Sequence, residues 1–370
     1  MASYPSAVKS FASRSAAQTI ASAHVNDLQD EVNAIEAGLL NGLAHNLTIS
    51  TGGLTVSTGA TTLGGSLSVA GGSTFAGAVT FSGAVSGVES ALVCEGRLTL
   101  ESGVPVSTSD QSAKTSAYFT PYGGNRIGLY DGSAWKIRTF AELTISLAGL
   151  TASMPYDVFA YDNAGTVTIE TLIWTNTTTR ATALTTQNGV LVKTGATTRR
   201  YIGTIYINAT GGQTDDTQAK RYVYSHDKSE TRPLGKREAT ASWNYTTATI
   251  RQARADATNQ VEVMVGWPSR AIDLHLVASA GNATADVEVM AAIGLDSTSA
   301  VSSACLFSNG RTVGGNDGFN LALHAVYREA IAVGWHRLVW LEYSGATGTT
   351  VWKGVSAGAY QTGLAGTWKC

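Results

Sequence analysis

The chain has 370 residues, of which only 14% are charged, and its formal net charge at pH 7 is -2. Soluble domains usually carry about 25% charged residues, and a balance this close to zero offers no basic footprint for nucleic acid. No run of 18 apolar residues is present to form a membrane-spanning helix. We therefore expect neither nucleic-acid binding nor membrane insertion.

The first predicted element is a helix within residues 22–42. Its apolar residues follow spacings of 3, 4, 3 and 4, the a and d repeat of a coiled coil, and they are Val25, Leu28, Val32, Ile35 and Leu39. Ser22 precedes this seam as a candidate N-cap, and Gly42 follows it as a stop signal. A helix of this length is marginal alone in water, so we predict that the seam trimerises. The alternative is an ordinary amphipathic helix packed on a globular domain.

A segment without charge follows the helix. From Ala37 to Val88 there is no Asp, Glu, Lys or Arg, and short apolar pairs such as Leu47 and Ile49 are separated by Gly-rich turns. Residues two apart leave the same face of a strand, but strands this short cannot bury that face alone. We interpret residues 43–96 as a fibrous shaft of β-strands from intertwined chains.

Longer alternating strands begin at Arg97, so the fold class is predicted to be mainly β. Residues 125–137 indicate a hairpin around Asp131-Gly132, and residues 156–170 indicate a second one, with a further strand at 201–207. We predict a β-sandwich domain at 97–235 and a C-terminal sandwich or jelly-roll-like head at 236–370. Strands are expected there at 260–265, 272–278, 286–293 and 336–343. The polar, basic stretch 225–238 is interpreted as the linker.

Three parts of the chain carry a resemblance to a known class of protein. They are the opening Met1-Ala2-Ser3-Tyr4-Pro5, the helix from His24 to Glu36, and the segment from Tyr118 to Trp135. These resemble fibre proteins of tailed bacteriophages. The resemblance implies a homotrimeric virion fibre in which residues 1–21 attach to other virion proteins, and it transfers no catalytic residues.

Signals for catalysis or metal binding are weak. The six histidines show no ligand spacing with one another or with cysteine, so no metal or other cofactor is predicted. Asp215, Asp216 and Asp256 could contribute a carboxylate pair for glycoside hydrolysis, but solvated turn positions explain them as well. Cys94, Cys305 and Cys370 are far apart and odd in number, which fits free thiols in a protein assembled in a reducing cytoplasm.

Aromatic residues near the C-terminus are the candidates for receptor binding. Flat rings among polar groups suit sugar faces or protein receptors, and the candidates are Trp335, Trp352, Tyr360 and Trp368. Trp340 lies in an apolar strand and is predicted to be core, whereas Trp352, Tyr360 and Trp368, set among Gly, Ser and Thr, are the better candidates for exposure. The alternative is that these rings fill a sandwich core or the interface between three heads.

Together these features predict a non-enzymatic bacteriophage fibre, located in the virion, whose C-terminal domains attach to a glycan or protein of the host surface. One alternative is a head fibre that decorates the capsid without a specific receptor. Another is a polysaccharide-degrading tailspike, which would be expected to show a long solenoid or a cleft bearing carboxylates. The residues leave the choice between tail and head open.

Overall fold

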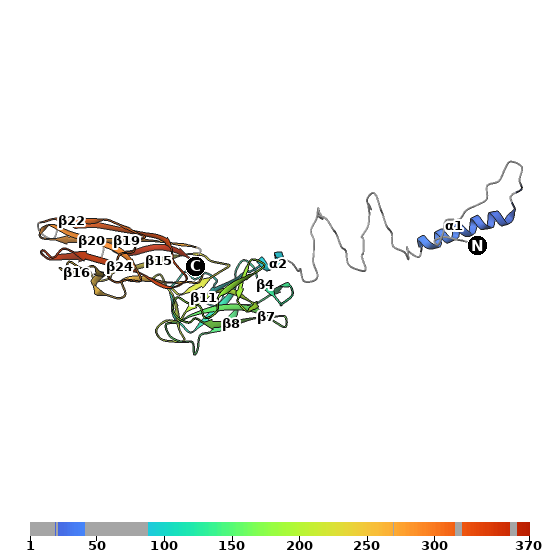
Figure 1. Cartoon of the computed structure of the whole chain (residues 1–370), viewed down its shortest axis with the longest axis horizontal. Helices are drawn as coiled ribbons and strands as arrows, with labels where there is room; N and C mark the ends of the chain where they lie inside the picture. The colour runs from blue at the N-terminus through green and yellow to red at the C-terminus, as the bar shows by residue number, and fades with distance from the viewer. Residues whose placement is uncertain (1–18, 20, 41–87, 269, 315–319, 356–360) are drawn as a thin grey trace. The chain divides into compact units, whose positions relative to one another are not determined.

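The computed structural model describes residues 19, 21–40, 88–268, 270–314, 320–355 and 361–370 (Figure 1). Contacts divide the chain into two units, residues 1–79 and 80–370, and each is described by itself. No helix in the described ranges is both long and apolar enough to cross a membrane.

In the first unit, the predicted helix is α1, Ser22–Leu40. Four residues of the predicted seam are strongly exposed: Val25 by 54%, Leu28 by 55%, Val32 by 45% and Ile35 by 40%. Among the described residues, no side chain covers these four, so the helix presents an apolar stripe. The side chain of Leu39 lies outside the described residues.

Most of the predicted shaft, 43–87, also lies outside the described residues. The last part of the predicted shaft, residues 88–96, is described, and it contains a helix that the prediction does not include. A short helix, α2 (Val88–Leu92), precedes the first strand, β1 (Gly96–Thr99). The contacts place residues 88–96 in the second unit.

The second unit is mainly β, and its first strands form three sheets. The smallest is the hairpin of β4 (Arg126–Tyr130) and β5 (Trp135–Thr139), next to a three-stranded sheet of β1, β3 (Ser116–Pro121) and β6 (Leu143–Ser146). A six-stranded sheet has the order β8 (Thr166–Ile173), β7 (Pro155–Asn163), β11 (Ala196–Tyr206), β10 (Val190–Lys193) and β9 (Leu184–Gln187), and β14 (Val223–Ser225) pairs with β11.

Both predicted hairpins are confirmed. The strands β4 and β5 pair antiparallel, as do β7 and β8, and β11 completes the second group by pairing with β7. The turn between β4 and β5 is held by Asp131, whose Oδ1 accepts hydrogen bonds from the backbone N–H groups of Ser133 and Ala134, both at 2.9 Å. A short acidic side chain at this position is a common turn former for that reason.

The later strands form two larger sheets. An eight-stranded sheet contains β2 (Gln111–Lys114), β12 (Thr214–Asp216), β13 (Lys220–Arg221), β18 (Gln260–Val265), β24 (Gly334–Ser344), β20 (Ala285–Leu295) and β22 (Asn309–Val313), with β17 (Arg251–Gln252) on β24. A seven-stranded sheet contains β15 (Thr231–Arg237), β26 (Gly363–Lys369), β19 (Ala271–Asn282), β23 (Leu321–Ala330) and β21 (Cys305–Phe307), with β25 (Thr350–Lys353) on β19 and β16 (Ser242–Tyr245) on β25. A single turn of 3-10 helix, η1 (Ala253–Ala255), follows β17.

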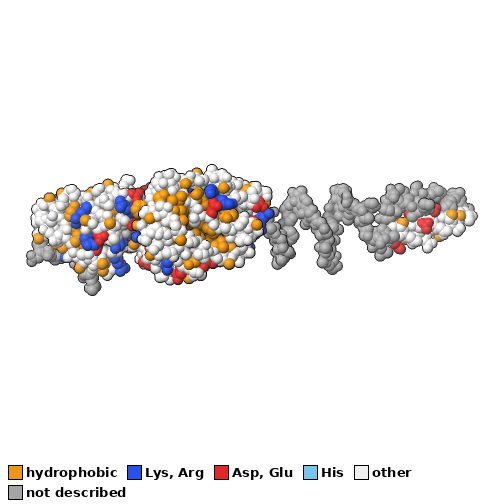
Figure 2. Space-filling view, turned by 90° about the horizontal axis from the view of Figure 1, so that it is seen from below, with side chains coloured by type: hydrophobic (Ala, Val, Ile, Leu, Met, Phe, Trp, Pro, Cys, Tyr) orange, Lys and Arg blue, Asp and Glu red, His pale blue; other side chains and the backbone are white. Residues whose placement is uncertain are grey.

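The two larger sheets share one hydrophobic core. On β19, Ile272, Leu274 and Leu276 are buried at alternate positions, as expected for a strand with one face in a core. They belong to the same buried cluster as Val261 and Leu341 of the other sheet. A second cluster joins the three-stranded sheet to β7 and β11. On the face seen in Figure 2, charged side chains are few and scattered among polar and hydrophobic ones.

The predicted linker at 225–238 is wrong for most of its length. Residues 231–237 form β15, which pairs with β26 over seven positions, so the expected domain boundary at 235 falls inside a strand. The eight-stranded sheet also crosses this boundary, because β13 pairs in parallel with β18. Strand pairing therefore ties residues on both sides of position 235 into the same sheets.

A buried arginine anchors the beginning of the second unit. Arg200 Nη1 donates hydrogen bonds to the carbonyl oxygens of Ala91, Val93 and Gly128 at 2.7, 2.9 and 2.9 Å. Its Nη2 lies 3.3 Å from a carboxylate oxygen of Asp227. One guanidinium thus holds the end of α2 and the residue that follows it against β4 and the central strand β11.

We predict that Arg200→Met destabilises the protein by about 3 to 5 kcal/mol, because the change leaves one carboxylate and three carbonyl groups without their donor. Arg199→Met is the matched control, since this neighbour on β11 is partly exposed and pairs with Glu170 at 2.8 Å. Partly exposed pairs contribute at most about 1 kcal/mol. Urea denaturation of both variants measures the difference, and equal losses would contradict the anchoring role.

Candidate functional site

The structure does not place the predicted receptor residues at the surface. Trp352 is 0% exposed and Trp368 is 2% exposed, so the prediction that they are exposed is wrong. Trp352 on β25 lies opposite Trp243 on β16, and the two rings stack with centroids 6.3 Å apart. Trp340, predicted to be core, is fully buried and meets Trp243 edge-on at 5.8 Å.

The other three aromatic candidates, Trp368, Trp335 and Tyr360, differ in their surroundings. Trp368 lies 6.0 Å from Tyr224, between centroids, inside the same core. Trp335 is partly buried and stacks on Tyr206 at 5.5 Å. Tyr360 lies outside the described residues. Sequence analysis missed the burial because Gly, Ser and Thr around a tryptophan do not reveal which side of a strand the ring occupies.

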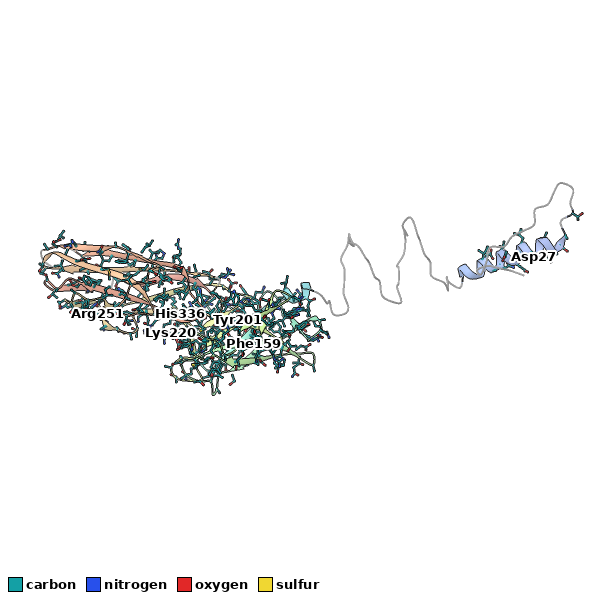
Figure 3. All side chains as sticks on the ribbon, viewed as in Figure 1. Asp27, Phe159, Tyr201, Lys220, Arg251 and His336 are labelled. Atoms are coloured by element: carbon teal, nitrogen blue, oxygen red, sulfur yellow. The ribbon has the colours of Figure 1, made fainter. Side chains whose placement is uncertain are left out.

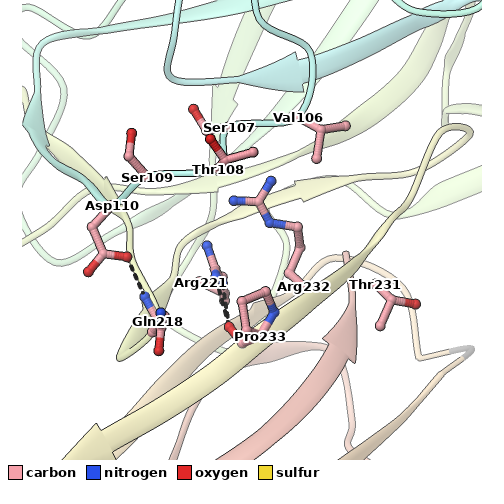
Figure 4. A pocket seen from close by; sticks show the side chains of 10 residues that line it. All are labelled: Val106, Ser107, Thr108, Ser109, Asp110, Gln218, Arg221, Thr231, Arg232 and Pro233. Atoms are coloured by element: carbon pink, nitrogen blue, oxygen red, sulfur yellow. Dashed lines mark hydrogen bonds between the residues drawn. The ribbon is translucent and has the colours of Figure 1, made fainter.

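A pocket lies where β15 passes the segment before β2 (Figure 4). It has a volume of about 280 Å³ and is lined by Val106, Ser107, Thr108, Ser109, Asp110, Gln218, Arg221, Thr231, Arg232 and Pro233. The lining contains two arginines, which come from β13 and β15, and several hydroxyl groups. These residue types bind oxygen-rich groups.

Arg232 faces inward because it sits at a buried position of a strand. On β15, Thr231 and Pro233 are exposed, whereas Arg232 and Leu234 are buried. Arg232 is 5% exposed, and Figure 4 shows its guanidinium directed towards Ser107 and Thr108. Its Nη2 lies 3.4 Å from Asp216 Oδ2, and among the described residues its Nε has no hydrogen-bond partner.

Arg221, by contrast, is well satisfied. Its Nη1 donates to Asp216 Oδ1 at 2.8 Å, and its Nε and Nη2 donate to the carbonyl oxygen of Pro233 at 3.1 and 2.7 Å. This arginine therefore holds β12 and β15 together and already uses the near carboxylate oxygen of Asp216. Arg232 contacts the other carboxylate oxygen of Asp216, Oδ2, at the longer distance of 3.4 Å.

A third buried arginine adds to the positive charge. Arg97 donates from Nη1 to the carbonyl oxygen of Lys228 at 2.8 Å, and its Nε has no hydrogen-bond partner among the described residues. Burial lowers the pKa of Arg97, and the charge of Arg232 acts in the same direction. The two guanidiniums thus lie close enough to repel each other.

Cys370 lies in the same cluster, where a charge on it opposes the effect of Arg232 on the pKa of Arg97. Burial raises the pKa of the Cys370 thiol to about 11, and Asp216 acts in the same direction against Arg97, Arg221 and Arg232. The thiol stays protonated near neutral pH. The buried carboxylate of Asp216 pairs with Arg221 and Arg232 and acts on Arg97, and the partly buried Glu230 also acts on Arg97.

A second pocket adjoins the first. It has a volume of about 490 Å³, and Asp110 and Gln218 line both pockets. The backbone N–H of Gln218 donates to Asp110 Oδ1 at 2.9 Å, so these two residues form the wall between them. Lys236 and Arg237 add basic groups to the second pocket.

The acidic residues considered for glycoside hydrolysis are committed to other contacts. Asp215 accepts hydrogen bonds from the Ala113 N–H and from Asn208, Asp216 pairs with Arg221, and Asp256 pairs with Arg254. Asp215 and Asp216 are buried in β12, so the expectation that they are solvated turn residues is wrong. Within the described ranges, no group of three or more His, Cys, Asp or Glu residues could hold a metal ion.

The pocket was missed in the sequence because Arg232 was interpreted as part of a linker. The signal that could have found it is the alternation of Arg232 and Leu234 in a stretch that otherwise looks polar. A charged residue in phase with an apolar one on a strand faces the interior.

No protein-family model matches the chain, and no curated protein matches it. Among solved structures, the insecticidal delta-endotoxin Cry8Ea1 from Bacillus thuringiensis gives a TM-score of 0.20 at 10% identity, over 76% of this chain and 55% of the toxin. A structure of the Gx strain of infectious bursal disease virus gives 0.19 at 11% identity, over 72% of this chain and 81% of the viral one. Structural similarity at these TM-scores supports no inference about function.

We predict that Trp352→Ala lowers the free energy of unfolding by about 3 to 5 kcal/mol, since it opens a cavity beside Trp243 in the core. Guanidinium denaturation followed by circular dichroism measures this loss. Trp335→Ala is the comparison, and a smaller loss is expected because that ring is partly exposed. A Trp352→Ala protein as stable as the parent would contradict the burial.

Proposed function

We propose that the protein is a non-enzymatic, homotrimeric fibre of a tailed bacteriophage that presents its C-terminal β unit for attachment to the host cell surface. The observation that carries the proposal is the apolar stripe of α1, which one chain leaves in water, followed directly by a segment without charged residues. The resemblance of residues 1–5, 24–36 and 118–135 to phage fibre proteins supports the same function.

Association of three chains would remove the energetic cost of the exposed stripe. Burying a Val, Leu or Ile side chain contributes roughly 1.5 to 3 kcal/mol, whereas a helix of this length is marginal by itself. The spacing of Val25, Leu28, Val32 and Ile35 matches a coiled-coil seam, in which each side chain packs into a partner helix. The finer architecture that we propose is a coiled coil at 22–42 and an intertwined β shaft within 43–96, followed by the C-terminal β unit.

Three identical C-terminal units on one fibre would bind a surface together. Once one unit is bound, the others are held near the same surface at high effective concentration, so weak individual contacts give strong attachment. Residues 1–21 would join the fibre to other virion proteins, after assembly in the host cytoplasm. Cryo-electron microscopy of virions separates a tail location from a head location.

The trimer is tested by light scattering coupled to size-exclusion chromatography. One chain has a mass of 38.4 kDa, and we expect three times this value for the full-length protein. Ile35→Asp places a charge in the seam and should lower the mass towards that of one chain, or loosen the trimer at low concentration.

Asn33→Asp is the matched control, because it adds the same charge to an exposed position outside the seam. It should leave the mass unchanged. A wild-type protein that stays monomeric at working concentration would refute the trimer. An Ile35→Asp variant that remains fully trimeric would show that the seam is not required.

A further inference from the structure

We propose that the pocket between the segment 106–110 and β15 binds an oxyanion through Arg232, and that the ligand is an anionic residue of a saccharide. The identification of a surface glycan as its source rests on the proposed attachment function. Binding of the oxyanion itself rests only on the geometry of the pocket.

The first argument is charge. Arg97, Arg221 and Arg232 are all buried, and the buried carboxylate among them belongs to Asp216. Burying a charge without a partner costs several kcal/mol, and removing water from three cations around one anion leaves that cost uncompensated. Glu230 also acts on Arg97 but is only partly buried, and Asp110 is exposed, so water screens part of their charge. A bound anion would supply negative charge that offsets the positive charge of these arginines inside the pocket.

The second argument is the free hydrogen-bonding capacity of Arg232. A guanidinium has five N–H donors in a planar fork, but in the described part of the chain the side chain of Arg232 makes one hydrogen bond, at 3.4 Å, with Asp216. The fork points across the pocket towards Ser107 and Thr108 (Figure 4). A carboxylate or phosphate group placed there could accept two parallel hydrogen bonds, the geometry for which arginine is suited.

The third argument is the shape and lining of the site. Thr108 and Ser109 are exposed and bring hydroxyl groups to the mouth of the first pocket. Its volume of about 280 Å³ suits one small charged unit. The adjoining pocket of about 490 Å³ offers Gln218, Lys236 and Arg237, which can hydrogen-bond sugar hydroxyls. A saccharide with its anionic residue at Arg232 could continue into this second space.

The test measures binding of small probes to the full-length protein by titration calorimetry. The probes are glucuronate, inorganic phosphate and glucose, at matched ionic strength. We expect glucuronate or phosphate to bind, and glucose to bind at least tenfold more weakly. Binding of glucuronate alone assigns the ligand to a carboxylated sugar, and binding of phosphate alone assigns it to a phosphorylated one.

Arg232→Gln should weaken binding of the anionic probe at least tenfold. Arg311→Gln is the control, because Arg311 is an exposed arginine on β22 that pairs with Asp286 at 2.9 Å, and it should bind as the parent does. Without ligand, Arg232→Gln should be as thermally stable as the parent or more so, since an incompletely paired buried charge is removed. A purely structural arginine would give a lower melting temperature instead.

The proposal is overturned if neither anion binds the parent protein, if glucose binds as well as the anion that binds, or if Arg232→Gln binds that anion as tightly as the parent. If Arg232→Gln fails to fold, the comparison of the two anions with glucose on the parent still decides. These results are independent of the light-scattering result, so failure of the pocket and failure of the trimer are distinguishable.

Discussion

The pairing of β15 with β26 is the contact on which the arrangement of the second unit depends. It runs over seven positions, from Thr231 opposite Lys369 to Arg237 opposite Gly363, and it joins the middle of the chain to its last strand. Arg232 and Leu234 lie two positions apart and therefore share the buried face of β15. The same pairing thus buries Leu234 in the core and directs Arg232 into the pocket. The position of β15 therefore determines both the core packing of Leu234 and the placement of Arg232 in the candidate site.

Buried guanidiniums serve two different purposes in this unit. Arg200 and Arg221 donate several hydrogen bonds to carbonyl and carboxylate oxygens, and they fasten segments that are distant in sequence. Arg97 and Arg232 make fewer such contacts. The Nε atoms of Arg97, Arg232 and also Arg200 have no hydrogen-bond partner among the described residues. A folded chain tolerates such a group when the surroundings fix it, and the fixed position is what makes it useful for recognising a ligand.

Local patterns in the sequence predicted the strands well, and long-range packing decided the rest. The Asp131-Gly132 turn and the alternation in 156–170 define hairpins without help from distant residues, and the structure has both. Trp352 and Arg232 could not be placed in this way. Which face of a strand is covered depends on a partner more than a hundred residues away, as Trp243 is for Trp352 and Asp110 is for the pocket.

The clamp formed by Arg200 has a mechanical consequence. Its three carbonyl partners include Ala91 and Val93, at the point where the polypeptide enters the second unit. Tension applied at Val88 would reach this guanidinium early and pass to β11, which lies in the middle of its sheet rather than at an edge (β11 is labelled in Figure 1, and its residue Tyr201 in Figure 3). A load applied there is shared by hydrogen bonds to both neighbouring strands, so the unit resists being peeled open one strand at a time.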